Sequence, residues 1–103
     1  MTEAAEPLPS IVHNEAERRF EAVVGDELAT ARYERDGDTM IFTHTHVPEA
    51  HEGQGIGSAL AKAALEYALA ENAAVVPACP FIAAYVERHP RYQHLVKADT
   101  PPR

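Results

Sequence analysis

The stretch GQGIGSALAKAALEYALAE, residues 53–71, sets three alternating glycines directly ahead of a strongly periodic apolar segment. Within it, Ile56, Leu60, Ala64 and Tyr67 recur at spacings of three and four, the period of one face of a helix. The pattern predicts a helix from about 55 to 71, with the glycine turn at its N-terminus.

The glycine turn favours a phosphate-binding function. Gly53, Gly55 and Gly57 bring no Cβ atoms, so successive backbone amides can converge on one anion at a helix N-terminus. The turn lacks the GK[ST] ending of nucleoside-triphosphate loops, and its GxGxG spacing differs from the GxGxxG of dinucleotide-binding folds. A turn that serves only the entry of the chain into the helix is the alternative.

Three runs of alternating residues precede the turn, at 19–24, 27–35 and 39–47. Short Gly- and Asp-containing segments separate them, as in tight hairpins, so the runs predict an antiparallel meander. Residues 11–14 are a candidate for a further short strand. Alternation in the third run predicts four residues on one face of the sheet: Met40, Phe42, His44 and His46.

Beyond the helix, the apolar run 73–77 predicts a short strand. Residues 81–88 predict a second helix, which ends before Pro90 because the residue preceding a proline avoids helical geometry. The order of meander, helix, strand and helix predicts an α/β fold with a mixed sheet, as a single domain over residues 10–96.

The composition argues against several classes of function. Nine basic against 16 acidic side chains give a net charge of −7, which disfavours general nucleic-acid binding. No apolar run approaches the ~20 residues needed to span a bilayer, and the N-terminus lacks the features of a signal peptide. We therefore expect a cytoplasmic protein that binds no membrane.

Cys79 is the single cysteine, which excludes an internal disulfide. Residues 1–9 and 97–103 lack periodicity and are expected to be disordered tails.

The segment EGQGIGSAL, residues 52–60, resembles the Q/R-x-x-G-x-G/A turn with which N-acetyltransferases of the GNAT superfamily hold the pyrophosphate of acetyl-CoA. More narrowly, THTHVPEAHEGQGIGSAL (43–60) followed by VVPACPFIAAYVERHPRYQHLV (75–96) resembles a family of very short GNAT-like proteins with a CPF...HP signature. The resemblance extends from about residue 25 to 96. It implies a minimal GNAT-like fold and transfer of an acetyl group to an amine.

The resemblance also implies a mode of cofactor binding. Backbone groups of His46 and Val47 are expected to bind the pantetheine arm, and six turn residues to surround the diphosphate. Two departures affect side-chain contacts: Glu52 replaces the usual Arg or Gln of the turn, and His46 replaces a usually acidic strand residue. A carboxylate facing a pyrophosphate would repel it, so we expect Glu52 to point outward or to weaken binding. The six turn residues are Gly53, Gln54, Gly55, Ile56, Gly57 and Ser58.

Cys79 and Tyr85 are candidate catalytic residues. Tyr85 lies in a segment that resembles the A-x-x-Y-E-K stretch, where GNAT enzymes keep a tyrosine proton donor; a buried core tyrosine is the alternative. Cys79 belongs to the CPF motif, and in the small family this cysteine has been proposed as an acyl acceptor. A position at a helix start would lower its pKa and favour the thiolate. A thiol that lines the site without covalent chemistry, and an inert packed thiol, are its alternatives.

The histidines of the third run are candidates for polar contacts. His44 is expected close to the acceptor pocket, as a hydrogen-bonding residue or a base. His44, His46 and His51 lack a clear acidic partner, so we expect no metal site.

The sequence thus predicts an acetyl-CoA-dependent N-acetyltransferase, which acts directly or through an acetyl-Cys79 intermediate. A non-catalytic acyl-CoA binding or sensing module is the alternative, because the chain lacks the length for the extra elements that usually build an acceptor pocket. A partner-binding domain with a purely structural glycine turn is a third. The amine acceptor is unidentified, although net acidity favours a cationic amine, such as a protein lysine or a polyamine. We expect a monomer or a weak homodimer.

Overall fold

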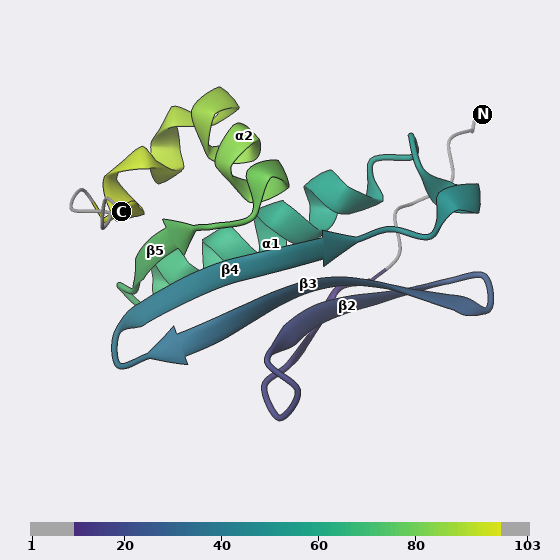
Figure 1. The fold of residues 1–103 in the computed structure, drawn as a ribbon, viewed down its shortest axis with the longest axis horizontal. Helices are drawn as coiled ribbons and strands as arrows, with labels where there is room; N and C mark the ends of the chain where they lie inside the picture. Colours follow the sequence, from purple (N-terminus) through teal and green to yellow (C-terminus); the bar gives the residue numbers. More distant parts are fainter. Residues whose placement is uncertain (1–9, 98–103) are drawn as a thin grey trace.

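The computed structural model describes residues 10–97 and contains one five-stranded mixed sheet (Figure 1). The first four strands pair antiparallel in chain order, and the fifth pairs parallel with the fourth. This order confirms the predicted α/β fold. The predicted tail 1–9, and 98–103 of the second, lie outside the described residues. The strands are β1 (Val12–Asn14), β2 (Arg19–Val24), β3 (Glu27–Asp36), β4 (Thr39–His46) and β5 (Ala74–Pro77).

The two predicted helices form within one residue of their predicted bounds, as α1 (Ile56–Ala70) and α2 (Pro80–Arg88). Proline suits the first position of α2, because the amide that it lacks would have no partner within the helix. Two 3-10 turns that the periodicity did not predict complete the fold, η1 (Glu49–His51) and η2 (Pro90–Leu95).

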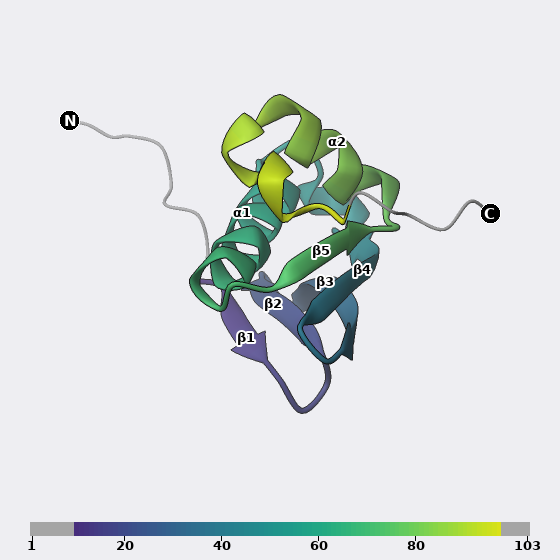
Figure 2. The same cartoon turned by 90° about the vertical axis from the view of Figure 1, so that its left-hand side faces the viewer.

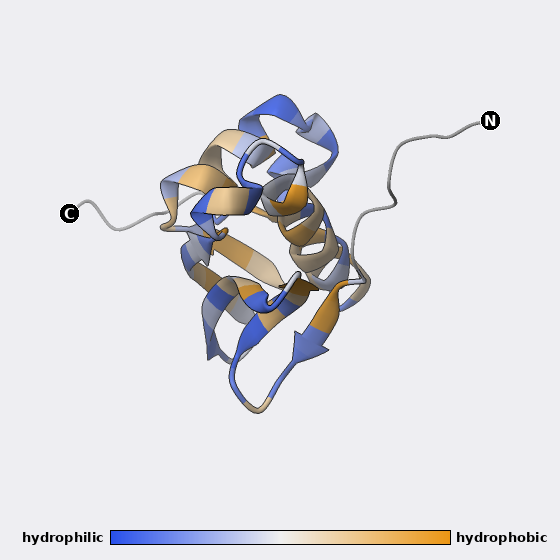
Figure 3. Ribbon diagram, turned by 90° about the vertical axis from the view of Figure 1, so that its right-hand side faces the viewer, coloured by the Kyte–Doolittle hydropathy of each residue, from blue (hydrophilic) through white to orange (hydrophobic). Residues whose placement is uncertain are grey.

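The helices form one layer and the sheet the other (Figures 1 and 2). Helix α1 packs against β2, β3 and β4, while α2 contacts β4, β5 and α1. The sheet face below them is apolar, and Figure 3 shows orange segments meeting between the two layers. The opposite face exposes charged residues of β3. Core residues of the sheet include Phe20, Ala22, Ala31, Tyr33, Met40, Phe42 and Val75.

A β-bulge interrupts β4 at Thr43. Tyr33 pairs with Phe42 and the preceding Arg32 pairs with His44, so Thr43 is left without a partner in β3. The extra residue reverses the alternation of the strand, because each residue added moves all later side chains to the other face. The predicted shared face of Met40, Phe42, His44 and His46 is therefore wrong. Past the bulge, Thr45 pairs with the buried Ala31 and faces the helices, whereas His44 and His46 are exposed on the opposite face.

Strand β5 pairs with only the first half of β4. Its last partner is Phe42, opposite Pro77, and the Cys79 amide then donates a hydrogen bond to the Phe42 carbonyl at 2.8 Å. From there the chain turns into α2 and leaves the second half of β4. The two parallel strands thus separate at the point where the bulge redirects Thr45. At the far side of β5, the Lys97 amide donates to the Val75 carbonyl at 3.0 Å.

Candidate functional site

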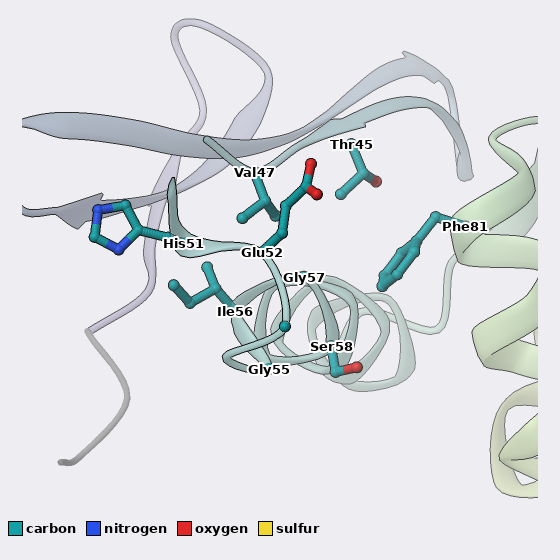
Figure 4. Close-up of a pocket in the computed structure, with 10 residues that line it drawn as sticks. Thr45, Val47, His51, Glu52, Gly55, Ile56, Gly57, Ser58 and Phe81 are labelled. Carbon is teal, nitrogen blue, oxygen red and sulfur yellow. The ribbon is translucent and has the colours of Figure 1, made fainter. Parts of the chain in front are cut away.

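A cavity of about 450 Å³ lies where β4 separates from β5, beside the glycine turn and the starts of α1 and α2 (Figure 4). The second half of β4 supplies one wall, and the turn with the first residues of α1 supplies another. The first turn of α2 closes the third side with the Phe81 ring. The lining residues are Thr45, Val47, His51, Glu52, Gly53, Gly55, Ile56, Gly57, Ser58 and Phe81.

The glycine turn has the backbone geometry of a cradle. Gly53 and Gly55 have φ values of 87° and 84°, a region in which residues with a Cβ are strained, and Gly55 is the N-cap of α1. No side chain caps the helix, so the amides of its first turn stay available to a ligand. Of the six residues predicted to surround a diphosphate, Gln54 alone does not line the cavity; it is exposed.

The third glycine of the motif serves a different purpose. Gly57 has no positive φ, and a Cβ atom at this position would lie 2.9 Å from Cζ of Phe81. Glycine therefore makes room for the Phe81 ring, which packs against the first turn of α1. The sequence alone predicts no role for Phe81, although this residue belongs to the CPF motif.

Thr45 links the cavity to Cys79. Thr45 lines the cavity, and its Oγ1 lies at hydrogen-bond distance, 3.5 Å, from Sγ of Cys79. Cys79 itself is only 5% exposed and is the N-cap of α2. Burial raises the pKa of the Cys79 thiol, but the Thr45 hydroxyl and the backbone amides of Ile82 and Phe81 favour the thiolate, and the net pKa is lowered. The sequence predicts no role for Thr45, because residues 43–46 read THTH and are all polar. Their pattern therefore does not reveal the bulge at Thr43.

The other two candidate catalytic residues lie away from the cavity lining. Tyr85 is buried in α2, and its ring stacks on His89 with centroids 3.9 Å apart. Burial raises the pKa of its hydroxyl. His44 lies on the exposed sheet face beside Arg32, on the opposite side of the sheet from Thr45. The structure thus brings Cys79 to the cavity through Thr45 and does not bring Tyr85 or His44 to its wall.

Glu52 points into the cavity. Figure 4 shows its carboxylate extending toward Thr45, over the space between Val47 and Phe81. Of the two alternatives predicted for Glu52, an outward-pointing side chain is therefore wrong, and weaker binding of the pyrophosphate stays a prediction. Glu52 is the C-cap of η1, and its amide donates a hydrogen bond to the Glu49 carbonyl at 3.2 Å. The neighbouring His51 also lines the cavity, and its buried Nδ1 has no hydrogen-bond partner among the described residues.

The sequence model of the family described as GCN5-related N-acetyl-transferase matches residues 19–95, from the start of β2 to the end of η2. The chain belongs to this family. Protein NATD1 of Mus musculus is similar to this GCN5-related chain, with 33% identity over 88 residues that cover 82% of this chain and 80% of the relative. Protein NATD1 of Homo sapiens is also 33% identical over 88 residues, covering 82% and 78%.

A solved structure shows the same fold. The solution structure of a GCN5-like protein from Staphylococcus aureus matches with a TM-score of 0.67 and 29% identity, over 85% of this chain and 87% of that one. The match spans sheet and helices together, so the predicted minimal GNAT-like fold is confirmed.

Two further features of residues 10–97 bear on the class of function. None of their helices is both long and apolar enough to cross a membrane. Their His, Cys, Asp and Glu side chains also form no group of three or more that could hold a metal ion.

Proposed function

We propose that this GCN5-related protein is an acetyl-CoA-dependent N-acetyltransferase. The observation that carries the proposal is the cavity between the separating strands, with its wall of backbone at the start of α1. Membership of the family implies acetyl-CoA as the donor. The acceptor is an amine that remains to be identified.

The glycine turn fits the diphosphate of coenzyme A. Two residues of positive φ bring its backbone close to the cavity without side chains in the way, and the free amides of α1 point their positive dipole ends toward it. The Ser58 hydroxyl, also at the cavity wall, offers a further donor. The backbone of His46 and Val47, past the last partner of β5, is our candidate for contacts with the pantetheine arm.

The acetyl group would react at the Thr45 end of the cavity. In direct transfer, the amine nitrogen attacks the thioester carbonyl, and the bond between the carbonyl carbon and the coenzyme sulfur breaks. The coenzyme thiolate takes up a proton, and the amine loses one. In the two-step route, the Cys79 thiolate attacks the thioester carbonyl, the bond to the coenzyme sulfur breaks, and coenzyme A leaves as a thiolate that takes up a proton. The amine nitrogen then attacks acetyl-Cys79, the bond to the Cys79 sulfur breaks, and the proton lost by the amine regenerates the Cys79 thiol. The lowered pKa of Cys79 favours the second route.

A non-catalytic acyl-CoA binding module is the second candidate function. It is favoured by the placement of Tyr85 and His44 away from the cavity wall, and by the low exposure of Cys79. Binding without turnover, unaffected by Cys79→Ala, would identify the module.

Intact-mass spectrometry after incubation with acetyl-CoA separates these possibilities. The two-step route predicts one added acetyl group on wild type and none on Cys79→Ala, with release of coenzyme A measured by chromatography. Unmodified wild type that releases coenzyme A when an amine is added supports direct transfer. Wild type that binds acetyl-CoA but neither becomes modified nor releases coenzyme A with any amine would contradict the transferase proposal.

A further inference from the structure

Phe81 is an exposed aromatic residue in the wall of the cavity. It is 38% exposed, whereas Ile56 of the same wall is 2% exposed and Val47 is partly buried. The other exposed large apolar residues between 10 and 97 are Val12 and Val23, and neither lines the cavity. An apolar ring that faces a cavity gains free energy when an uncharged part of a ligand covers it.

The far edge of the Phe81 ring rests on Gly57, in the first turn of α1 (Figure 4). A Cβ atom at residue 57 would lie 2.9 Å from Cζ of Phe81, 3.4 Å from Cε2 and 3.5 Å from Cε1. The backbone conformation of Gly57 does not require glycine, because its φ is not positive and alanine is the better residue within a helix. The contact with the ring therefore accounts for the glycine.

We propose that Phe81 binds the pantetheine arm of coenzyme A, and that Gly57 holds the ring in position for this contact. The inference rests on the proposed binding of acetyl-CoA and adds a binding residue to it. Coenzyme A has an anionic diphosphate, for which the backbone of the glycine turn is the candidate, and an arm of methyl, methylene and amide groups without charge. The backbone of Val47 is the candidate contact for this arm on the β4 side of the cavity, and Phe81 supplies an apolar surface on the α2 side.

A direct contact of Gly57 with the diphosphate is the competing explanation for the glycine, and one added methyl group distinguishes the two. If Gly57 served the diphosphate, Gly57→Ala would weaken binding of coenzyme A whatever residue occupies position 81. If Gly57 is the seat of the ring, the methyl group displaces the ring into the cavity, and a shorter side chain at position 81 should remove the effect. Leucine lacks the three ring atoms that the Cβ would meet.

The first test is calorimetry of the full-length chain with coenzyme A, for wild type, the two single variants and their combination. Gly57→Ala should raise the dissociation constant about tenfold when residue 81 is Phe and less than about twofold in the Phe81→Leu background. Phe81→Leu alone should raise it about threefold, because leucine covers less of the arm. Val23→Ala, at an exposed apolar residue outside the cavity lining, is the control and should bind as wild type. Gly57→Ala should unfold at the same urea concentration as wild type, which shows that its weaker binding is not a loss of folding.

NMR spectra of wild type with bound coenzyme A identify the part of the ligand that Phe81 contacts, without any substitution. We expect nuclear Overhauser effects between the ring protons of Phe81 and the methyl and methylene protons of the arm. Effects that join the ring only to the adenosine, or none between the ring and the arm, would overturn the role of Phe81. An equal loss of affinity from Gly57→Ala in both backgrounds would overturn the role of Gly57. Absence of coenzyme A binding to wild type would instead contradict the proposed function.

Discussion

Thr45 Oγ1 and Cys79 Sγ lie 3.5 Å apart, across the gap that opens where β4 and β5 separate. The contact exists because the bulge at Thr43 turns Thr45 toward the helix layer. One residue lines the cavity and the other is the N-cap of α2, so the pair joins the cavity to the thiol.

Thr45→Val should raise the pKa of the Cys79 thiol, because it removes the hydroxyl that favours the thiolate while burial, which disfavours it, remains. The pH dependence of alkylation by iodoacetamide measures this pKa, since only the thiolate reacts. The rate at neutral pH should fall several-fold. Thr43→Val is the control, because the Thr43 hydroxyl bonds to the Arg32 carbonyl instead. Equal alkylation profiles for Thr45→Val and wild type would show that Thr45 does not tune the thiol.

We predict that His13 makes the free energy of unfolding depend on pH. Its ring stacks on Phe20 with centroids 4.1 Å apart, and its Nε2 lies 2.6 Å from the Tyr33 hydroxyl. Burial lowers the pKa of His13, while Glu15 raises it and Arg35 lowers it further. The unfolded chain therefore binds more protons than the folded one below about pH 6.5. The contribution to stability is present above that pH and is lost as the pH falls through the lowered, folded-state pKa.

Urea unfolding at pH 7 and pH 5 tests this effect. The free energy of unfolding of His13→Gln should fall less between these two pH values than that of wild type, by a fraction of a kcal/mol. His94→Gln, at an exposed histidine of η2, should show the wild-type decrease. An unchanged decrease in His13→Gln would contradict the assignment.

The Tyr92 hydroxyl ties η2 to α1 by donating to the Glu66 carboxylate at 2.6 Å. Burial and this carboxylate raise the pKa of Tyr92 to about 12. Tyr92→Phe should lower the free energy of unfolding by about 1 kcal/mol, the typical contribution of such a hydrogen bond. Tyr85→Phe is the comparison, because a phenylalanine ring keeps the stacking on His89. A loss in Tyr85→Phe as large as that in Tyr92→Phe would contradict this account of the Tyr92 hydroxyl.

Tyr85→Phe also tests the predicted role of Tyr85 as a proton donor. If Tyr85 donates a proton to the leaving thiolate, Tyr85→Phe should lower kcat about 100-fold. If Tyr85 is only a core residue, kcat of the variant should stay within about threefold of the wild-type value.

The fold could be predicted because its signals are local. The helix over 56–70 follows from apolar spacing, and the meander follows from alternation broken by Gly- and Asp-rich turns. The bulge could not be predicted in the same way. Residues 43–46 read THTH, polar at every position, so the pattern there carries no information on which face is buried. Simple alternation therefore predicts His44 on the face of Met40 and Phe42, which Thr45 occupies in the structure.

The site was predicted only in part, because sequence spacing reveals local backbone conformation but not contacts between residues far apart in the chain. Gly53 and Gly55 were recognised from spacing because their role is a local backbone conformation. The role of Gly57 depends on Phe81, 24 residues away, which is a tertiary contact that sequence spacing does not show. The match to the family covers residues 19–95 and assigns no role to any side chain of the cavity.

Calorimetry of Gly55→Ala against Gly37→Ala shows whether the backbone at the start of α1 holds coenzyme A. Both glycines have positive φ, 84° and 60°, so alanine strains both and should cost each variant about 1–2 kcal/mol of stability. Gly37 lies in the β3–β4 turn, outside the cavity lining. We predict that Gly55→Ala binds coenzyme A about tenfold more weakly than wild type, and that Gly37→Ala binds it with wild-type affinity. Equal affinities of the two variants would contradict this role of the backbone.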